Sequence, residues 1–382
     1  MVSQGSPTGP GPNARWDSGW RRLPFPAVYR RTGSGPARPG GAVARLPGGV
    51  RVAHRGCRWM DVLCAGMYRA CSTWQYEVIA HLVEHHGGGR RLGYLTGAQY
   101  AALIRGDAGH GSLAPGTAWR VLKSHEGDRC FARALAEGRA VAVYAHRDVR
   151  DVVFSLMHKR GLTFEQLLRQ GMLHQILAND RFWTRQPGVL IQRYDDLLAD
   201  PVGGVLGLAR HLGIALTDGE AAAIAAAYSL ESNKARTEAL RRRLEQAGLD
   251  LNEAGNTQIC DATTLLHWNH VRNGGSGSWL TQSTPAQRAI LDRLCARWLS
   301  ARSYPLRPAG AESGPLVEAP IGWRDALRLQ LDRAIGLLNY RVRALSQQFP
   351  RLARRAKRLL GIPTDRPAGA TVWSDTRPAG VG

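Results

Sequence analysis

Short apolar runs alternate with helical patterns through the middle of the chain. Four apolar runs of five or six residues are typical of buried strands: residues 60–65, 119–123, 141–145 and 189–194. The last three are rich in β-branched and aromatic side chains. Apolar residues at helical spacing predict helices over residues 72–85, 164–177, 196–212, 218–227, 232–247 and 285–299. Strands that alternate with helices predict an α/β fold of three layers, in which helices cover both faces of a central parallel β-sheet.

The composition changes on both sides of this region. The first fifty residues hold eight prolines and ten glycines, which favours a flexible tail over a packed core. Prolines return after residue 304, where they are typical of a linker. We therefore predict a flexible Pro/Gly/Arg-rich tail, a folded domain, a linker, a basic amphipathic helical segment and a disordered tail, over residues 1–56, 57–304, 305–321, 322–362 and 363–382.

The helical segment near the C-terminus carries a seven-residue repeat. One leucine recurs every seven residues and a second apolar residue lies between each pair: Leu331, Ile335, Leu338, Val342, Leu345, Phe349 and Leu352. Such a seam allows a homodimer through this helix, and the arginines beside it allow peripheral contact with an anionic membrane. We favour a third interpretation, in which the helix packs on its own domain and Pro350 interrupts it.

The net charge of +21 lies mainly at the two ends of the chain. Residues 1–60 carry ten basic and one acidic side chain, and residues 321–382 carry twelve and four. Only four of the 51 basic residues are lysines, an arginine bias typical of a GC-rich genome, so we expect no nucleic-acid partner. The alternative function that the charge leaves open is a non-catalytic basic module that binds an anionic membrane surface or nucleic acid through its termini.

Targeting and metal signals are not evident in the sequence. No run of eighteen apolar residues occurs and no secretory pattern opens the chain. We therefore expect a cytoplasmic protein, either free or peripheral at the inner face of the membrane. The six cysteines form no C-x-x-C pair and no zinc spacing, so we expect no metal.

The first candidate motif joins a predicted strand to a predicted helix. Its loop and first helical turn place Arg69 beside the hydroxyls of Ser72 and Thr73, and backbone N–H groups there can hold a phosphate. Compared with the nucleotide P-loop G-x-x-x-x-G-K-[ST], Gly66 and Thr73 align, but Cys71 and Ser72 replace the second glycine and the lysine. The missing lysine disfavours phosphoryl transfer from ATP. An ordinary helix N-terminus is the alternative.

Two further motifs follow predicted strands. Lys123 and His125 lie two residues apart at a strand end and so face the same way. Arg147 lies just beyond the next strand, and Ser155 follows eight residues later, about two turns down a helix. These positions indicate a site at the carboxyl ends of the strands, where parallel sheets bind ligands. A structural histidine and a surface salt-bridge network are the alternatives.

The segment after Arg147 is rich in charge, and the last motif is rich in glycine. Asp148 and Asp151 flank Arg150, and we expect both to lock the turn by ion pairing. Residues 269–279 form a glycine-dense segment with Arg272 near its start, and glycines let a backbone approach a ligand closely and move. A disordered connector is the alternative for the second segment.

Together, in this order, the motifs resemble the PAPS-dependent sulfotransferase family over about residues 58–300. That family's phosphosulfate loop usually runs Pro, Lys or Arg, Ser, Gly, Ser or Thr, Thr, Trp or Leu. Arg69, Ser72, Thr73 and Trp74 match it, whereas Tyr68, Ala70 and Cys71 depart from it. The glycine-to-cysteine change at Cys71 puts cofactor affinity in question, because glycine lets the loop turn tightly.

The resemblance extends to the other motifs. It matches Lys123-Ser124-His125 to the family's catalytic segment, Arg147 and Ser155 to its 3′-phosphate site, and Tyr194 to a tyrosine near the adenine. The closing loop of the family matches at Arg272, Gly274, Gly277 and Trp279, with Asn273 and Ser278 substituted.

The resemblance implies sulfuryl transfer from PAPS as cosubstrate, with no metal. His125 is then the general base, and Lys123 and Arg69 stabilise charge on the transferring group. The residues implied to bind the cofactor are Arg69, Ala70, Cys71, Ser72, Thr73, Trp74, Arg147, Ser155, Tyr194, Arg272, Asn273 and Gly274. The acceptor, a hydroxyl or an amine, is a small molecule, a lipid, a glycopeptide or a carbohydrate. We expect variable loops over residues 95–116 and 159–186 to select it.

Overall fold

The computed structural model describes residues 60–105, 119–253, 256–271, 274–306 and 323–349, together with residues 352, 355, 372 and 373. All of them belong to one compact unit, Val43–Gly382. The predicted tail over residues 1–56 lies outside the described residues. So do the predicted linker beyond residue 306 and the predicted C-terminal tail apart from residues 372 and 373.

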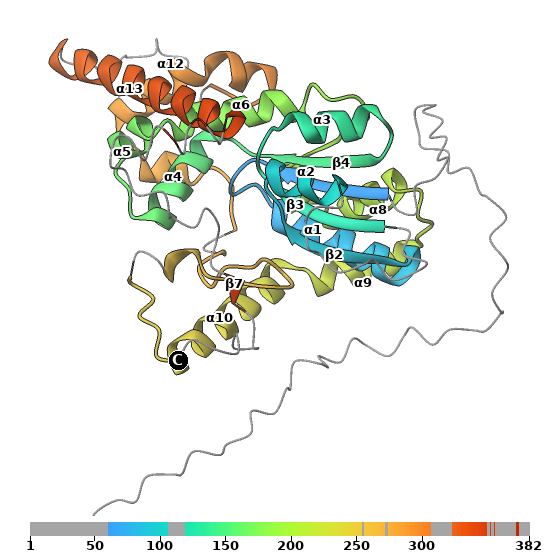
Figure 1. The fold of residues 1–382 in the computed structure, drawn as a ribbon. Coiled ribbons are helices and arrows are strands. Elements are labelled where there is room, and N and C mark those ends of the chain that lie inside the picture. Colours follow the sequence, from blue (N-terminus) through green and yellow to red (C-terminus); the bar gives the residue numbers. More distant parts are fainter. Residues whose placement is uncertain are drawn as a thin grey trace, which may run out of the picture. The chain divides into compact units, whose positions relative to one another are not determined.

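Five parallel strands form the central sheet in the order β2-β3-β1-β4-β5 (Figure 1). Their bounds are Met60–Gly66, Gly89–Tyr94, Trp119–Ser124, Ala140–His146 and Leu190–Arg193 for β1 to β5. All but β2 match predicted strands. The sequence pattern missed β2 because this edge strand reads Gly-Arg-Arg-Leu-Gly-Tyr and is only half-buried.

Helices cover both faces of the sheet, which confirms the predicted three-layer α/β fold. On β1, Val62 and Cys64 face one core, which α1 (Ser72–Leu82), α8 (Pro201–His211) and α9 (Asp218–Ala227) complete. Leu63 and Ala65 face a second core on the other side of the sheet. That core is completed by α2 (Gly97–Arg105), α3 (Arg129–Ala136), α4 (Val149–Arg160), α5 (Phe164–Arg169), α6 (Met172–Trp183) and α12 (Pro285–Ala301).

Two predicted helices are each two helices in the structure. Residues 164–177 divide into α5 and α6 because Gly171 adopts a positive φ of 69° between them. Residues 196–212 divide into α7 (Tyr194–Ala199) and α8, because Asp200 caps the second helix and Pro201 starts it. The segments 95–116 and 159–186 are therefore wrongly described as loops, since α2, α5 and α6 occupy most of their described residues.

The remaining elements are short or lie after the sheet. A π-helical turn, Val83–Gly87, extends α1, and Thr284 caps α12. Leu240 and Leu244 of α10 (Leu230–Gln246) form a small buried cluster with Leu251 and Ile259. The rest are the 3₁₀ turn Asn256–Gln258, β6 (Cys260–Asp261), α11 (Trp279–Gln282), α13 (Trp323–Gln348) and β7 (Val372–Trp373), which pairs with β6.

The long helix α13 packs on α5 and α6 (Figure 1). Gly336 makes this close approach possible, because a Cβ there would lie 2.2 Å from the carbonyl oxygen of Leu168. The Asn339 amide donates to the Arg169 carbonyl at 2.7 Å, and Arg169 forms an ion pair with Asp332. None of the helices that the structure describes is long and apolar enough to cross a bilayer.

A buried carboxylate ties β1 to β3 and α2. Asp61 accepts hydrogen bonds from Arg120 Nε at 2.5 Å and Nη2 at 2.7 Å, and from the Tyr100 hydroxyl at 2.8 Å. Asp61 and Arg120 are almost fully buried. Removing one partner of such a pair leaves the other charge without compensation in the core.

We therefore expect Asp61→Ala to lower the free energy of unfolding by about 3–5 kcal/mol, measured by denaturant titration. The matched control Tyr100→Phe removes one hydrogen bond and keeps the ion pair, so it should cost only about 1–2 kcal/mol. A cost for Asp61→Ala no larger than that of the control would show that the ion pair does not stabilise the sheet.

Candidate active site

Three strand ends meet at one edge of the sheet. β1 lies between β3 and β4, and its end pairs in register with both: Ala65 with Ser124, and Gly66 with Ala145. The loop after β1, His125 after β3 and Arg147 after β4 therefore lie at the same edge. The structure thus brings together the first three predicted motifs.

The loop after β1 turns tightly onto α1. The Met67 N–H donates to the Ala145 carbonyl at 2.8 Å, and Arg69 and Cys71 adopt positive φ angles of 61° and 66°. Cys71 stands where the sulfotransferase loop has glycine, and its backbone has the left-handed conformation that glycine favours. Burial raises the pKa of the Cys71 thiol to about 12, so it stays protonated at neutral pH.

Cys71→Gly should raise the free energy of unfolding by about 1 kcal/mol, because a left-handed conformation costs an L-residue about that much. Thermal and denaturant unfolding measure the change. Cys71→Ala is the matched control: it keeps a Cβ and removes the thiol, so it should give no gain. Equal gains from both variants would assign the effect to the thiol and not to the backbone.

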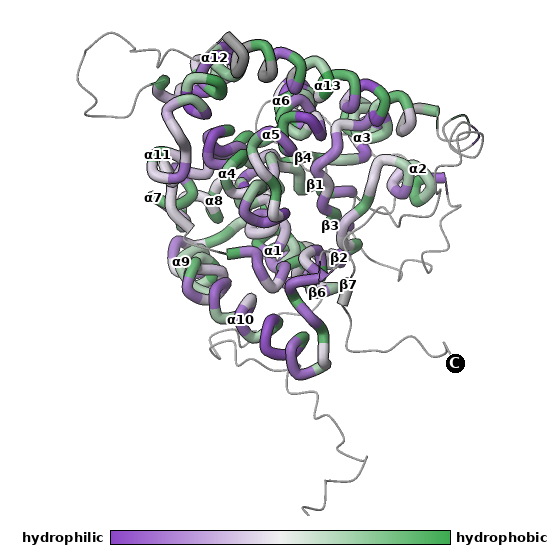
Figure 2. The backbone as a smooth tube through the Cα atoms, turned by 90° about the vertical axis from the view of Figure 1, so that its left-hand side faces the viewer, coloured by the Kyte–Doolittle hydropathy of each residue, from purple (hydrophilic) through white to green (hydrophobic). Residues whose placement is uncertain are grey.

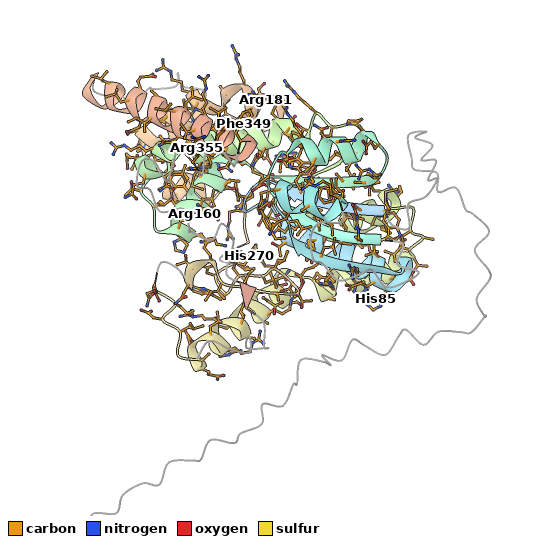
Figure 3. All side chains as sticks on the ribbon, viewed as in Figure 1. His85, Arg160, Arg181, His270, Phe349 and Arg355 are labelled. Carbon is orange, nitrogen blue, oxygen red and sulfur yellow. The ribbon has the colours of Figure 1, made fainter. Side chains whose placement is uncertain are left out.

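Arg69 joins the loop to two other segments. Its Nε donates to the Ser155 hydroxyl at 2.9 Å, and its Nη2 donates to the His270 carbonyl at 2.6 Å. Ser155 lies on α4, and His270 lies after β6 and is labelled in Figure 3. One guanidinium thus holds the phosphate-loop candidate, α4 and the segment after β6 together.

Lys123 reaches the start of α1 from β3. Its ammonium donates to Thr73 Oγ1 at 2.5 Å, and His270 Nε2 lies 3.4 Å from the same oxygen. Burial lowers the pKa of Lys123 to about 8, which leaves it mostly protonated at neutral pH. A cation and a hydroxyl therefore lie at the helix N-terminus, where backbone N–H groups also favour an anion.

His125 is held in one tautomer. Its Nδ1 lies 2.7 Å from the carbonyl oxygen of Gly66. A carbonyl only accepts, so Nδ1 carries the proton and Nε2 can accept one. Burial, and then the Lys123 ammonium, lower the pKa of His125 to about 3. The rings of Tyr68 and Tyr94 lie beside it, with centroids 4.5 and 6.0 Å away.

Arg147 is nearly buried, and only some of its hydrogen-bond donors have partners. Its two terminal nitrogens donate to the carbonyls of Arg69, at 3.3 Å, and Gly275, at 2.7 Å. Its guanidinium lies 4.4 Å from the centre of the Tyr194 ring. Its Nε is buried without a hydrogen-bond partner among the described residues. A buried donor in that state favours an anionic ligand.

Asp151 anchors the glycine-dense segment, and this role of Asp151 was not predicted from the sequence. It accepts hydrogen bonds from the Gly277 and Trp279 N–H groups at 2.8 and 3.0 Å, and from the Ser278 hydroxyl at 3.0 Å. Both aspartates form ion pairs near this turn, and Asp148 pairs with Arg150. Asp151 pairs instead with Arg147, at 3.3 Å.

Most of the predicted site residues line one cavity of about 430 Å³. The predicted residues that line it are Arg69, Cys71, Thr73, Trp74, Arg147, Ser155, Tyr194 and Gly274. Ala70 and Ser72 are buried in the loop and helix and do not line it, and Lys123 lies behind Thr73. His125 also lies outside this lining. Arg272 and Asn273 lie outside the described residues.

Lys159 is a further cation that the sequence analysis missed. It lies one helical turn after Ser155 on α4, and that four-residue spacing was the signal that could have found it. Burial, and then the charges of Arg69 and Lys123, hold the pKa of Lys159 well below its usual range. Within the described ranges, no group of three His, Cys, Asp or Glu side chains could hold a metal ion.

The sequence model of the sulfotransferase domain matches residues 60–302, well over half of the chain. The chain belongs to the sulfotransferase domain family. The resemblance inferred from the sequence motifs is therefore confirmed.

A curated relative and two solved structures are also similar to this sulfotransferase-family chain. Human sulfotransferase 2B1 is 24% identical over 249 residues, 61% of this chain and 64% of the relative, so the match spans less than two thirds of that relative. The structure of retinol dehydratase in complex with retinol and PAP (adenosine 3′,5′-bisphosphate) has a TM-score of 0.45 at 17% identity. The match covers 65% of this chain and 83% of the retinol dehydratase chain. Mouse sulfotransferase 7A1 with PAP has a TM-score of 0.44 at 16% identity, with coverage of 64% and 84%.

Proposed function

We propose that this chain transfers a sulfuryl group from PAPS to a hydroxyl or amine of an acceptor. The observation that carries the proposal is the state of the Arg147 side chain. Its buried Nε has no hydrogen-bond partner among the described residues, and the contact of its guanidinium with the Tyr194 ring fixes its direction. Adenosine 3′,5′-bisphosphate, PAP, carries a 3′-phosphate that such a donor can hold, and Ser155 also lines the cavity. Common nucleoside triphosphates lack that group.

The N-terminus of α1 suits the phosphosulfate. Arg69 and Thr73 line the cavity there, and Lys123 donates to Thr73 from β3, within hydrogen-bond networks that fix their directions. Trp74, Leu197 and Tyr228 also line the cavity, and an adenine ring can pack on their apolar and aromatic surface. Arg272 and Asn273 remain part of the proposed 3′-phosphate site on the family resemblance alone.

The chemistry requires a protein base beside the acceptor and positively charged side chains beside the leaving phosphate. His125 Nε2 takes the proton from the acceptor oxygen or nitrogen as that atom bonds to sulfur. The bond between sulfur and the bridging oxygen breaks, and its electron pair leaves with the phosphate, where Lys123 and Arg69 stabilise the charge. Tyr68 and Tyr94 beside His125 favour an acceptor that presents an apolar face.

Arg147→Ala should weaken binding of PAP by about 2–3 kcal/mol, the scale of lost charge-assisted hydrogen bonds. Binding of adenosine 5′-phosphate, which lacks the 3′-phosphate, should change little. Calorimetric titration measures both. Arg210→Ala, which removes an exposed arginine on α8, is the matched control and should leave both affinities unchanged. Equal losses on the two nucleotides would show that Arg147 is structural.

His125→Ala should reduce turnover of PAPS by roughly two to four orders of magnitude, the usual contribution of acid–base catalysis. PAP binding should stay within a few-fold of the wild type, since the base contacts the acceptor. The exposed His158 on α4 provides the matched control, and His158→Ala should keep full turnover. Turnover of His125→Ala within a few-fold of wild type would remove His125 from the mechanism.

The pH profile separates a buried base from a solvated one. His125 works when neutral, and its lowered pKa of about 3 keeps it neutral at every pH well above that value. The acidic limb of kcat/KM that His125 causes should therefore lie near pH 3, and no such limb should appear between pH 5 and 8. A limb near pH 6.5 that vanishes in His125→Ala would contradict this burial of His125.

A further inference from the structure

A second cavity, of about 400 Å³, lies where α13 meets the domain, and we call it the α13 cavity. Figure 2 shows α13 lying across α6 on the same side of the sheet as α3. One wall of the cavity comes from α6 and from the residues after β3, and the other comes from residues 340–349. The second wall lies beyond residues 60–302, which match the sulfotransferase model, so it is an addition to the matched domain.

The α13 cavity begins beside the candidate base. Glu126 lines it and directly follows His125 in the chain. The rings of His125 and Tyr68 lie 4.5 Å apart between centroids. Burial raises the pKa of Tyr68, and smaller effects on it come, in order, from the charges of Arg160, Glu126 and Arg343. The neighbour of the candidate base is therefore close enough to both walls of the cavity to feel their charges.

The formal charges that line the α13 cavity balance. The carboxyl groups of Glu126 and Asp128 line it together with the guanidinium groups of Arg129 and Arg343. An apolar acceptor would cover these groups without offering them hydrogen bonds, which costs free energy. A neutral acceptor with several hydroxyls can donate to the carboxyl oxygens and accept from the guanidinium N–H groups. The lining therefore favours a polyhydroxylated acceptor.

Two amide side chains on α6 add hydrogen-bonding groups to the same lining. The Asn179 side-chain oxygen accepts from the Gly127 N–H at 3.2 Å, which sets the direction of the amide. The Asn179 Nδ2 is buried and has no hydrogen-bond partner among the described residues. Arg343 donates from the other wall to the Gln175 side-chain oxygen at 2.9 Å. A buried donor in the state of Asn179 Nδ2 is typical of a site that a ligand completes.

Aromatic side chains complete the wall on the side of α13. Tyr340 and Phe349 line the cavity there, and Phe349 is labelled in Figure 3. The C–H groups of a sugar ring gather on its faces and pack on aromatic rings, while its hydroxyls point outward to hydrogen-bonding partners. Aromatic surface next to carboxyl, amide and guanidinium groups therefore suits a sugar ring better than it suits a steroid or a simple phenol.

We propose that the α13 cavity binds the sugar rings of a carbohydrate acceptor and that one of the sugar hydroxyls reaches His125. That hydroxyl gives its proton to His125 Nε2 as its oxygen bonds to sulfur. PAP leaves with the electron pair of the broken bond between sulfur and the bridging oxygen. The inference rests on the proposed sulfuryl transfer, because it names the acceptor of that reaction. A volume of about 400 Å³ is ordinary for a ligand pocket.

Turnover of PAPS by the full chain with different acceptors tests the choice of substrate class. The carbohydrate probes are the neutral trisaccharides maltotriose, cellotriose and xylotriose. The other probes are 2-naphthol, androsterone and a tyrosine-containing peptide. At least one trisaccharide should have a kcat/KM about tenfold or more above every other probe, because a site with paired polar groups rejects acceptors that leave them unpaired.

The place of binding is tested by filling the cavity. Ala344 lines it and is half-buried, so the indole of Ala344→Trp should occupy the space of the sugar. This variant should raise the KM of the best trisaccharide by about tenfold or more and leave PAP affinity unchanged. The matched control is Ala334→Trp, an exposed position on the same helix outside the cavity lining, and it should behave like the wild type.

Single substitutions test the proposed contacts. Asn179→Ala and Tyr340→Ala should each raise the KM of that trisaccharide by about fivefold and change kcat little, because these groups hold the sugar before and during transfer. Tyr340→Phe keeps the ring and should lose less. Asn252→Ala, at an exposed asparagine outside the lining, is the control for Asn179. Circular dichroism and PAP titration report whether each variant keeps the fold and the cofactor site.

Three outcomes would overturn the inference while PAP still binds. They are no turnover of any trisaccharide, faster turnover of the naphthol, the steroid or the peptide than of every trisaccharide, and a trisaccharide KM that Ala344→Trp leaves unchanged. The last would place the acceptor outside the α13 cavity. Failure of the wild type to bind PAP is a different result, because it would contradict the proposed function itself.

Discussion

β1 pairs in parallel with β3 on one side and with β4 on the other, and the candidate site depends on that register. Because Ala65 pairs with Ser124 and Gly66 with Ala145, the groups that follow the three strands converge at one edge. His125 then reaches the Gly66 carbonyl, and Lys123 reaches Thr73 at the start of α1. The buried Asp61–Arg120 pair stabilises the other end of β1 and β3. Strand register thus positions both the phosphate-loop candidate and the candidate base.

The second constraint on the site is the repulsion among positively charged side chains that lie close together and largely buried. Arg69, Lys123 and Lys159 act on one another, and burial together with this repulsion lowers the pKa values of the two lysines. An anion bound among these cations would offset the repulsion and raise both pKa values again. The same environment keeps His125 neutral. One electrostatic arrangement therefore favours an anionic ligand and keeps a proton acceptor ready beside it.

The sequence predicted those features of the fold and the site that depend on interactions between residues close together in the chain. β1 and β4 are buried on both faces, so their apolar runs were visible, whereas the edge strand β2 carries two arginines and was not. Gly171 and Pro201 divide helices through local backbone geometry that the periodicity of apolar residues does not contain. Asp151 could not be assigned, because its partners lie 126 to 128 residues away along the chain. Lys123 and His125 were recognisable as a pair because their short spacing places both at the carboxyl end of β3.

Calorimetric titration of the wild-type chain with PAP and with adenosine 5′-phosphate tests the central claim most directly, since it requires no knowledge of the acceptor. We expect one site per chain, and tighter binding of PAP by at least about tenfold, the factor for one charge-assisted hydrogen bond. Failure to bind PAP, or equal affinity for the two nucleotides, would contradict the assignment of the cavity as a PAPS site.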